Sequence, residues 1–376
     1  MNGSFSEKKG EKPRILVAPL DWGLGHATRC IPVIRELLEQ GADPWLAGEG
    51  AQEELLRTEF PGLPFLQLPG YRVRYTKTGR GLAWKMIQQG PGLKRAIRYE
   101  QEWLKKIVDQ YRFDAVISDN RYGLYHARIP SVFITHQLYI KSSWGKWTER
   151  ILQKRNYNYI NKFSECWVPD LAGDNNLAGA LSHPLKKPTT SLKYIGLLSR
   201  FSGQDNGNTA RKAHLLVVLS GPEPQRSILE EKIINGITTY EGTATIVRGL
   251  PESKSVIPST NMIRVYNHLP SPELNAAMLQ AEWVIGRSGY STIMDIISLA
   301  KKSILVPTPG QTEQEYLGNY LMEKGKCFCL QQENFSLVSA LEKAAAFKYL
   351  LTPVQKNKDL KNVLSSFLQS ITPALG

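Results

Sequence analysis

A histidine and an aspartate, far apart in the sequence, are the residues best placed for acid–base chemistry. His26 follows the turn formed by Gly23 and Gly25, behind the apolar segment 14–19, and Asp119 follows the apolar segment 114–118. A carboxylate that holds an imidazole fixes its tautomer and raises its basicity, as a general base requires. Two other interpretations stay open. A lone histidine is more often structural, and an aspartate at this position also suits the start of an Asx turn.

Two loops in the second half of the chain carry small and polar residues suited to a phosphorylated sugar. Residues 286–292 (Gly-Arg-Ser-Gly-Tyr-Ser-Thr) precede an apolar helical pattern that contains Asp295, and residues 307–316 lead into another helix through Gln314 and Glu315. Backbone N–H groups at a helix N-terminus suit a pyrophosphate, and we expect Asp295 to meet ribose hydroxyls. Gln314 and Glu315 would meet the sugar, although Thr312 and Glu315 also fit a capping box.

Short apolar segments alternate with helical patterns on both sides of a polar stretch, residues 199–211. This alternation predicts an α/β fold with two doubly wound Rossmann-like domains facing a cleft, in which ligands bind at the carboxyl ends of the strands. We expect domains at residues 13–200 and 201–352, and a C-terminal helix within 353–376 that packs back on the first domain. The predicted strands are 14–19, 44–47, 114–118, 131–135 and 165–168, then 214–219, 243–247, 262–265, 283–286 and 303–306; a helix is predicted at 94–111.

Residues 286–295 followed by 307–319 resemble the donor-binding half of the family 28 glycosyltransferases, within the UDP-glycosyltransferase superfamily. The resemblance extends to the Gly-x-Gly-His loop at 23–26 and to residues 132–137, 195–200 and 216–221. It implies the GT-B fold and a UDP-sugar as co-substrate, with no separate cofactor. There are departures: the ribose position, usually Glu, is Asp295, and the family's paired glutamines are Gln314 and Glu315. The identity of the donor sugar therefore stays open, with N-acetylglucosamine as one candidate.

Carried over by position, the resemblance implies a role for each matching residue. His26 and Asp119 would be the catalytic pair, in an inverting transfer to a cell-envelope, lipid-linked or glycan acceptor. The chain has no Asp-x-Asp pair, so no bound metal is expected. The residues implied for the acceptor are Gly23, Gly25 and Gln137. Those implied for the donor are Arg200, Ser220 and Gly221 at the phosphates, His268 and Leu269 at the uracil, Ser288, Gly289, Tyr290 and Ser291 at the pyrophosphate, Asp295 at the ribose, and Gln314 and Glu315 at the sugar.

The charge pattern bears on partners. The chain has a net charge of +13, and residues 71–112 hold 11 basic and three acidic residues, interleaved with aromatic ones such as Trp84 and Trp103. Such a stretch attracts an anionic membrane surface or a lipid-linked diphosphate, while a solvated basic helix is the alternative. Nothing resembles a nucleic-acid-binding module, so nucleic acid is not expected as a partner. No apolar run reaches the roughly 18 residues of a membrane span and the N-terminus is polar, which favours a cytoplasmic protein, peripheral on the inner face of the membrane.

Two other functions remain compatible with these residues. A nucleotide-sugar epimerase uses the same fold and donor, but typically needs several acidic residues and histidines near the sugar, where this sequence offers Glu313 and Glu315. A non-catalytic protein that binds a nucleotide sugar is the other alternative. The C-x-C pair formed by Cys327 and Cys329 lacks a second pair to complete a zinc site, so we interpret both as ordinary strand residues.

Overall fold

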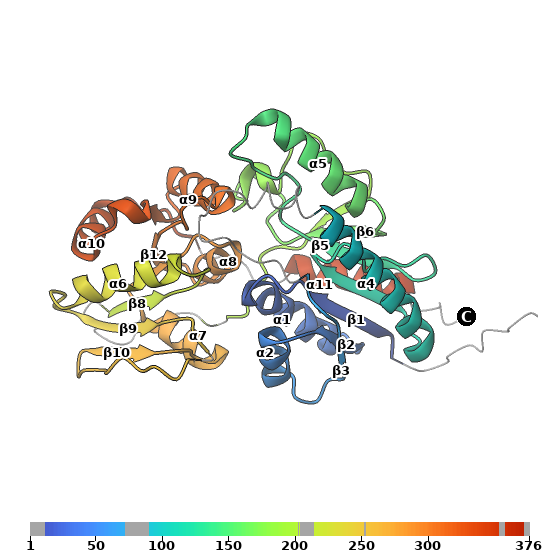
Figure 1. Cartoon of the computed structure of the whole chain (residues 1–376), viewed down its shortest axis with the longest axis horizontal. Coiled ribbons are helices and arrows are strands. Elements are labelled where there is room, and N and C mark those ends of the chain that lie inside the picture. The colour runs from blue at the N-terminus through green and yellow to red at the C-terminus, as the bar shows by residue number, and fades with distance from the viewer. Residues whose placement is uncertain are drawn as a thin grey trace, which may run out of the picture.

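The structure is a computed structural model that describes residues 12–71, 90–201, 203, 214–251, 253–352 and 358–371. Within these residues the chain forms two sheets of parallel strands, one with seven strands and one with six. The two sheets lie side by side with helices packed around them (Figure 1). The predicted fold class, two doubly wound α/β domains, is confirmed. The structure adds elements that the sequence pattern did not indicate, such as strand β3 (Phe65–Gln67) and helices α2 (Ala51–Glu59) and α5 (Lys146–Ile160).

The first sheet has the strand order β3-β2-β1-β4-β5-β6-β7. Its central strands read as continuous apolar runs, because helices cover both faces and leave residues such as Ile15, Val17 and Ile117 without exposed surface. The elements of this half are β1 (Arg14–Pro19), α1 (Leu24–Glu39), β2 (Asp43–Gly48), α2 (Ala51–Glu59), β3 (Phe65–Gln67), α4 (Gly90–Tyr111), β4 (Ala115–Asp119), β5 (Ser131–Ile134), α5 (Lys146–Ile160), β6 (Glu165–Val168), the 3₁₀ turn η1 (Gly179–Leu181) and β7 (Ser191–Tyr194).

The second sheet has the order β10-β9-β8-β11-β12-β13 and repeats the same arrangement. Cys329 lies in β13, and Cys327 is buried just before it. The elements are β8 (His214–Val218), α6 (Gln225–Ile237), β9 (Thr243–Val247), β10 (Ile263–Tyr266), α7 (Ser271–Gln280), β11 (Trp283–Gly286), α8 (Tyr290–Ser298), β12 (Lys302–Leu305), α9 (Thr312–Glu323), β13 (Phe328–Cys329), the 3₁₀ turn η2 (Gln332–Asn334), α10 (Leu337–Ala346) and α11 (Lys358–Ile371).

The strand orders decide which loops meet. In the first sheet β1 pairs with β4, with Pro19 opposite Asp119, so the loop after β1 lies beside the end of β4. In the second sheet β11 lies between β8 and β12, with Gly286 opposite both Val218 and Leu305. Each of these places is a switch point in strand order, where doubly wound sheets bind ligands beyond the carboxyl ends of the strands.

The two halves are joined by more than the linker. Helix α8 packs against α1 between the two sheets, and α11 returns to the first half, where it lies against α1 and β7 (Figure 1). Leu360 and Leu364 of α11 are fully buried, and the ring of Phe367 meets that of Trp167 edge-on at 5.4 Å. The last helix is therefore part of the core of the first half.

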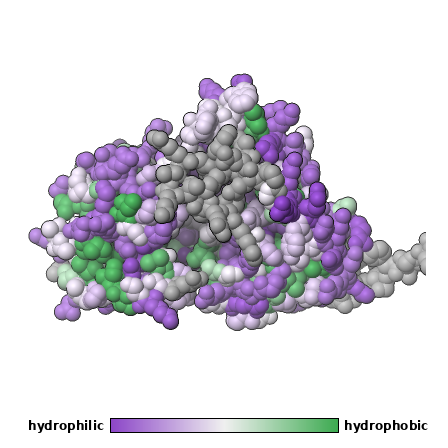
Figure 2. All heavy atoms as spheres, in the orientation of Figure 1, coloured by the Kyte–Doolittle hydropathy of each residue, from purple (hydrophilic) through white to green (hydrophobic). Residues whose placement is uncertain are grey.

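The surface is mostly polar. On the face shown in Figure 2, hydrophobic residues gather mainly over the second sheet. Met262 and Tyr266, at the edge strand β10, are 44% and 38% exposed. In the part of the chain that the structure describes, no helix combines the length and the apolar character needed to cross a membrane.

Candidate functional site

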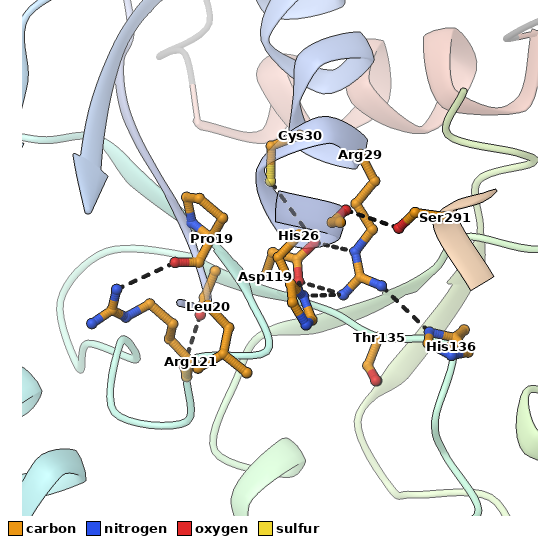
Figure 3. A network of polar contacts seen from close by, with 12 residues as sticks. Pro19, Leu20, His26, Arg29, Cys30, Asp119, Arg121, Thr135, His136 and Ser291 are labelled. Atoms are coloured by element: carbon orange, nitrogen blue, oxygen red, sulfur yellow. Dashed lines mark hydrogen bonds and ion pairs between the residues drawn. The ribbon is translucent and has the colours of Figure 1, made fainter. Parts of the chain in front are cut away.

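The structure brings His26 and Asp119 together. Gly23 precedes α1 with a φ of 79°, a conformation that favours glycine, and His26 stands in the first turn of the helix. Asp119 ends β4, directly beside the end of β1. As Figure 3 shows, the His26 ring faces the Asp119 carboxylate, with His26 Nδ1 2.6 Å from Asp119 Oδ1. These two predicted catalytic residues thus form a hydrogen-bonded pair.

Arg29 joins His26 and Asp119 as a third residue, which was not predicted from the sequence. It lies three residues after His26 on α1, is 2% exposed, and donates from both Nε and Nη2 to the two carboxylate oxygens of Asp119. Its Nη2 is also 2.9 Å from His26 Nδ1. The signal was present, because residues three apart on a helix share a face. Burial raises the pKa of Asp119, but the charge of Arg29, together with that of His26 once it is protonated at acid pH, outweighs burial and holds that pKa at about 2.

The electrostatic setting keeps His26 neutral near pH 7. Burial and the charge of Arg29 lower its pKa from the usual 6.5, and Asp119 only partly opposes them. At 2.6 Å a carboxylate oxygen and a nitrogen lone pair would repel each other, so we assign the proton to Nδ1, which donates it to Asp119. In this tautomer Arg29 Nη2 donates to Asp119 and makes no hydrogen bond to His26. Nε2 then carries the lone pair on a side chain that is 16% exposed. This is the state that a general base needs.

The cluster continues into the second half of the molecule. Arg29 Nη1 is 3.4 Å from Nδ1 of His136, whose Nε2 is 2.7 Å from Oε1 of Glu313 on α9. Gln137, predicted at the acceptor, donates from its side-chain amide to the same Glu313 carboxylate. The His136 ring stacks on Tyr290, with centroids 4.1 Å apart. His136 was not predicted as a site residue, and Glu313 was considered only for the epimerase alternative. Together they link the two halves beside His26 (Figure 3 shows His136).

The start of α8, predicted to hold the pyrophosphate, lies at the junction of the two halves. Gly289 is the residue before the helix, and the Ser288 hydroxyl is buried and donates to the Gln314 carbonyl. The Tyr290 hydroxyl donates to the Pro169 carbonyl. Ser291 donates to the carbonyl of Gly25 at 2.8 Å. A Cβ on Gly25 would lie 3.0 Å from Ser291 Oγ, so the glycine is what lets the two helices approach.

Asp295, predicted at the ribose, faces the segment that leaves the first half. Its Oδ1 accepts from the Ser199 hydroxyl at 2.7 Å, and its Oδ2 is 3.8 Å from Nε of Arg200. Burial raises the pKa of Asp295 to about 6, with Arg200 opposing the rise. Arg200 also donates to the Ser271 hydroxyl. Asp295 and Arg200 are thus brought together, and their roles toward a donor remain predictions.

The loop before α9 uses the residues predicted at the sugar for its own structure. Gln314 accepts from the Thr308 N–H and Glu315 accepts from the Gly310 N–H, each at 2.9 Å. The predicted capping box is not formed, because α9 begins after Gln311 and the Thr312 hydroxyl donates to the Lys141 carbonyl. The acidic side chain of this turn that faces the histidines is Glu313. A sequence pattern cannot tell which residue of a helix's first turn faces the neighbouring domain.

The remaining predicted residues lie on loops at the carboxyl edge of the second sheet. Ser220 and Gly221, which follow β8, are exposed, and so is His268 after β10; Leu269 is half-buried. Burial and the charge of Arg200 lower the pKa of His268. Among the described residues, no group of three or more His, Cys, Asp or Glu side chains is arranged to hold a metal ion.

Part of the basic stretch 71–112 lies outside the described residues, Trp84 included. The described part is mainly α4, where Lys94, Arg95 and Arg98 are exposed while Trp103 packs on the core of the first half. The helix therefore has a basic outer surface and an apolar inner one.

The chain is similar in sequence to known glycosyltransferases. Residues 255–368 match the glycosyltransferase family 28 C-terminal domain. The chain is 22% identical over 330 residues to an uncharacterized glycosyltransferase of Methanosarcina acetivorans, covering 83% of this chain and 84% of the relative. It is 23% identical over 339 residues, 86% of each chain, to a Coxiella burnetii protein named UDP-N-acetylglucosamine–N-acetylmuramyl-(pentapeptide) pyrophosphoryl-undecaprenol N-acetylglucosamine transferase.

The fold has matching solved structures. The crystal structure of the glycosyltransferase SnogD from Streptomyces nogalater superimposes with a TM-score of 0.62 at 13% sequence identity, covering 95% of this chain and 100% of that one. The structural similarity to SnogD supports the fold alone. The class of enzyme is supported by the match to the family 28 C-terminal domain and by the relatives that the chain matches over most of their length. The chain is a glycosyltransferase of the GT-B fold that resembles family 28.

Proposed function

We propose that this glycosyltransferase moves a sugar from a UDP-sugar onto a hydroxyl group of a lipid-linked or glycan acceptor, with inversion at the anomeric carbon. The observation that carries the proposal is His26, hydrogen-bonded to Asp119 at the junction of the two halves, whose Nε2 has no hydrogen-bond partner among the described residues. The name of the Coxiella burnetii relative specifies a UDP-N-acetylglucosamine donor and an undecaprenol-linked acceptor. UDP-N-acetylglucosamine is therefore the first donor to test.

The proposed step is a single displacement. The acceptor oxygen bonds to the anomeric carbon as its proton passes to Nε2 of His26, and the bond from that carbon to the diphosphate oxygen breaks, so UDP leaves with the electron pair. Asp119 stabilises the imidazolium that forms, and Arg29 holds Asp119 in place. Attack on the face opposite the leaving group inverts the configuration.

The leaving diphosphate needs positive charge. In this proposal it comes from the N–H groups at the start of α8 and from Arg200, whose buried Nε has no hydrogen-bond partner among the described residues. These groups are proposed to act without a metal ion, so EDTA should leave turnover unchanged. Residues 13–200 would then bind the acceptor and residues 201–352 the donor.

The basic surface of α4 supports a further part of the proposal, that the acceptor half rests on an anionic membrane. Each basic residue near an anionic bilayer contributes about 1 kcal/mol, so changing Lys94, Arg95 and Arg98 to Ser should weaken vesicle binding about 100-fold. Co-sedimentation with phosphatidylglycerol vesicles at low and high salt measures this, with the exposed pair Lys186 and Lys187 changed to Ser as control. Equal binding to neutral phosphatidylcholine vesicles would contradict it.

The test of the function is a panel of nucleotide sugars. A ligand that binds the native state raises the melting temperature, so the panel identifies the donor before any acceptor is known. Transfer to lipid-linked and glycan acceptors then follows, with the anomeric configuration of the product read by NMR. If no UDP-sugar stabilises the protein, or if the product retains the donor's configuration, the proposal is wrong.

An acceptor-free arm of the same experiment separates transfer from epimerisation. The structure gathers two histidines and two carboxylates, His26, His136, Asp119 and Glu313, in one cluster. Such a cluster is what the epimerase alternative requires. Conversion of a UDP-sugar into its epimer without acceptor would favour that alternative.

A further inference from the structure

We propose that Arg287 and Thr308 form the floor of a phosphate subsite beside Gly221, which takes a phosphate group of the nucleoside diphosphate donor. The proposal rests on the proposed function and adds two donor-binding residues to it. It follows from two buried polar groups that lie beside the same glycine.

Arg287 follows β11 and is 1% exposed. Four of its five N–H groups are used: Nη1 donates to the carbonyls of Val306 and Pro307, and Nη2 donates to the carbonyl of Gln225 and to Oε1 of Gln332. All four acceptors are uncharged. The fifth group, Nε–H, is buried and has no partner among the described residues.

Other buried arginines of the described residues have a carboxylate partner. Arg29 contacts Asp119, and Arg121 contacts Glu100. The remaining two, Arg226 and Arg248, both contact Glu230. No such ion pair to Arg287 occurs in the described part of the chain. Burial lowers the pKa of Arg287 only to about 10, so it stays protonated at neutral pH.

A buried charge without a counter-charge costs several kcal/mol, and an anion beside it removes that cost. Arg287 is thus a buried cation that lacks the anion its four counterparts have.

Thr308 supplies the second group. It is 1% exposed, and its hydroxyl oxygen is buried with no hydrogen-bond partner among the described residues. An ideal Cβ built on Gly221 would lie 3.5 Å from Thr308 Oγ1 and 3.9 Å from Arg287 Nε, with nothing else within 4 Å. Thr308 Oγ1 and Arg287 Nε therefore lie on the side of Gly221 toward which a side chain would project. The φ of Gly221, 102°, favours glycine.

The topology brings Gly221, Arg287 and Thr308 to the carboxyl edge of the second sheet. Because β8, β11 and β12 are adjacent, the loops that follow them meet at one edge of the sheet, and these loops hold Gly221, Arg287 and Thr308. Helix α8 begins at Tyr290, three residues after Arg287, and its N-terminus adds partial positive charge. A phosphate group accepts from both N–H and O–H groups, so a phosphate at Gly221 would supply acceptors for Arg287 Nε and for the Thr308 hydroxyl.

The test compares UDP with uridine by isothermal titration calorimetry. Thr308→Val keeps the shape of the side chain and removes the hydroxyl, and should weaken UDP binding about tenfold or more while uridine binding changes less than about twofold. Arg287→Lys should act in the same direction, because an ammonium group lacks Nε–H. Ser303→Ala is the matched control: Ser303 is also buried with an unpartnered hydroxyl, but at the opposite end of β12.

Three results would overturn the subsite. Parental UDP affinity in a folded Thr308→Val variant would overturn it and leave the donor site of the proposed function standing. Equal losses for UDP and uridine would also overturn it, since they would show that Thr308 serves only the fold. A parent protein that binds neither UDP nor uridine would overturn the proposed function, and the subsite with it. Thr308→Val decides the matter even if Arg287→Lys does not fold.

Discussion

Replacing Asp119 with asparagine removes the negative charge that Arg29 and His26 share. Asp119 has no exposed surface, and its two oxygens accept two N–H groups of Arg29 and one of His26. An asparagine offers one oxygen, so its amide N–H₂ would face a donor. Arg29, 2% exposed, would then be a buried cation without its carboxylate. Breaking such a pair costs about 3–5 kcal/mol.

The expected result has two parts. The melting temperature should fall on the order of 10 °C at pH 7, because 1 kcal/mol corresponds to about 2–4 °C in a domain of this size. Turnover should fall about 10²–10⁴-fold, because the imidazole loses the partner that sets its tautomer. Differential scanning fluorimetry and initial transfer rates on the same preparations measure the two effects.

The pH dependence of the stability loss checks its cause. The pKa of Asp119 in the folded protein, about 2, lies below its usual 3.8. Its charge therefore stabilises the fold above about pH 4, and that contribution is lost as the pH falls toward 2. Because Asp119 raises the pKa of His26, the parent's advantage over Asp119→Asn should be no smaller at pH 5 than at pH 8, and it should shrink below pH 4. An unchanged melting temperature at pH 7, or a difference that persists undiminished below pH 4, would show that the Asp119 charge does not stabilise the fold through Arg29.

Three further predictions concern His26, the contact between Gly25 and Ser291, and Asp295. Because burial and Arg29 lower the pKa of His26, His26 is neutral at pH 7, and kcat/KM should fall on the acid side only below about pH 6.5; a fall that begins above pH 7 would contradict this. Gly25→Ala should lower the melting temperature more than Ser291→Ala does. The double variant should melt no lower than Ser291→Ala alone, because without the Ser291 hydroxyl the new methyl group meets only the Cβ of residue 291, at 3.5 Å. Additive losses would show that helices α1 and α8 do not touch at these residues. Asp295→Ala should weaken UDP binding, measured by calorimetry, by roughly 1–3 kcal/mol if its carboxylate binds the ribose, and unchanged affinity would remove Asp295 from the donor site.

The sequence predicts the fold well because its strands are buried on both faces. Such strands are continuous apolar runs, as in β1 and β4, and these runs are easy to recognise. Strand β3, three residues long at the edge of its sheet, carries too few apolar positions to be recognised. The pairing of His26 with Asp119 was predictable because both follow strands that a doubly wound sheet places side by side.

The rest of the site depends on contacts between the two halves, which local patterns do not encode. Arg29 could have been predicted from the sequence, because it lies on the same helical face as His26. The interaction of His136 with Glu313 joins residues 177 positions apart, on elements whose relative placement follows from the packing of α8 on α1. The same holds for Glu315, which serves the loop before α9 while Glu313 faces the histidines.

Turnover of the His26→Asn variant tests directly whether His26 is the general base. Asparagine can still donate to Asp119 from a position close to that of Nδ1, but it has no nitrogen able to accept a proton. We expect kcat to fall on the order of 10²–10⁴-fold, with the melting temperature and the UDP affinity close to those of the parent. A variant that turns over at the parent's rate would show that His26 is not the general base.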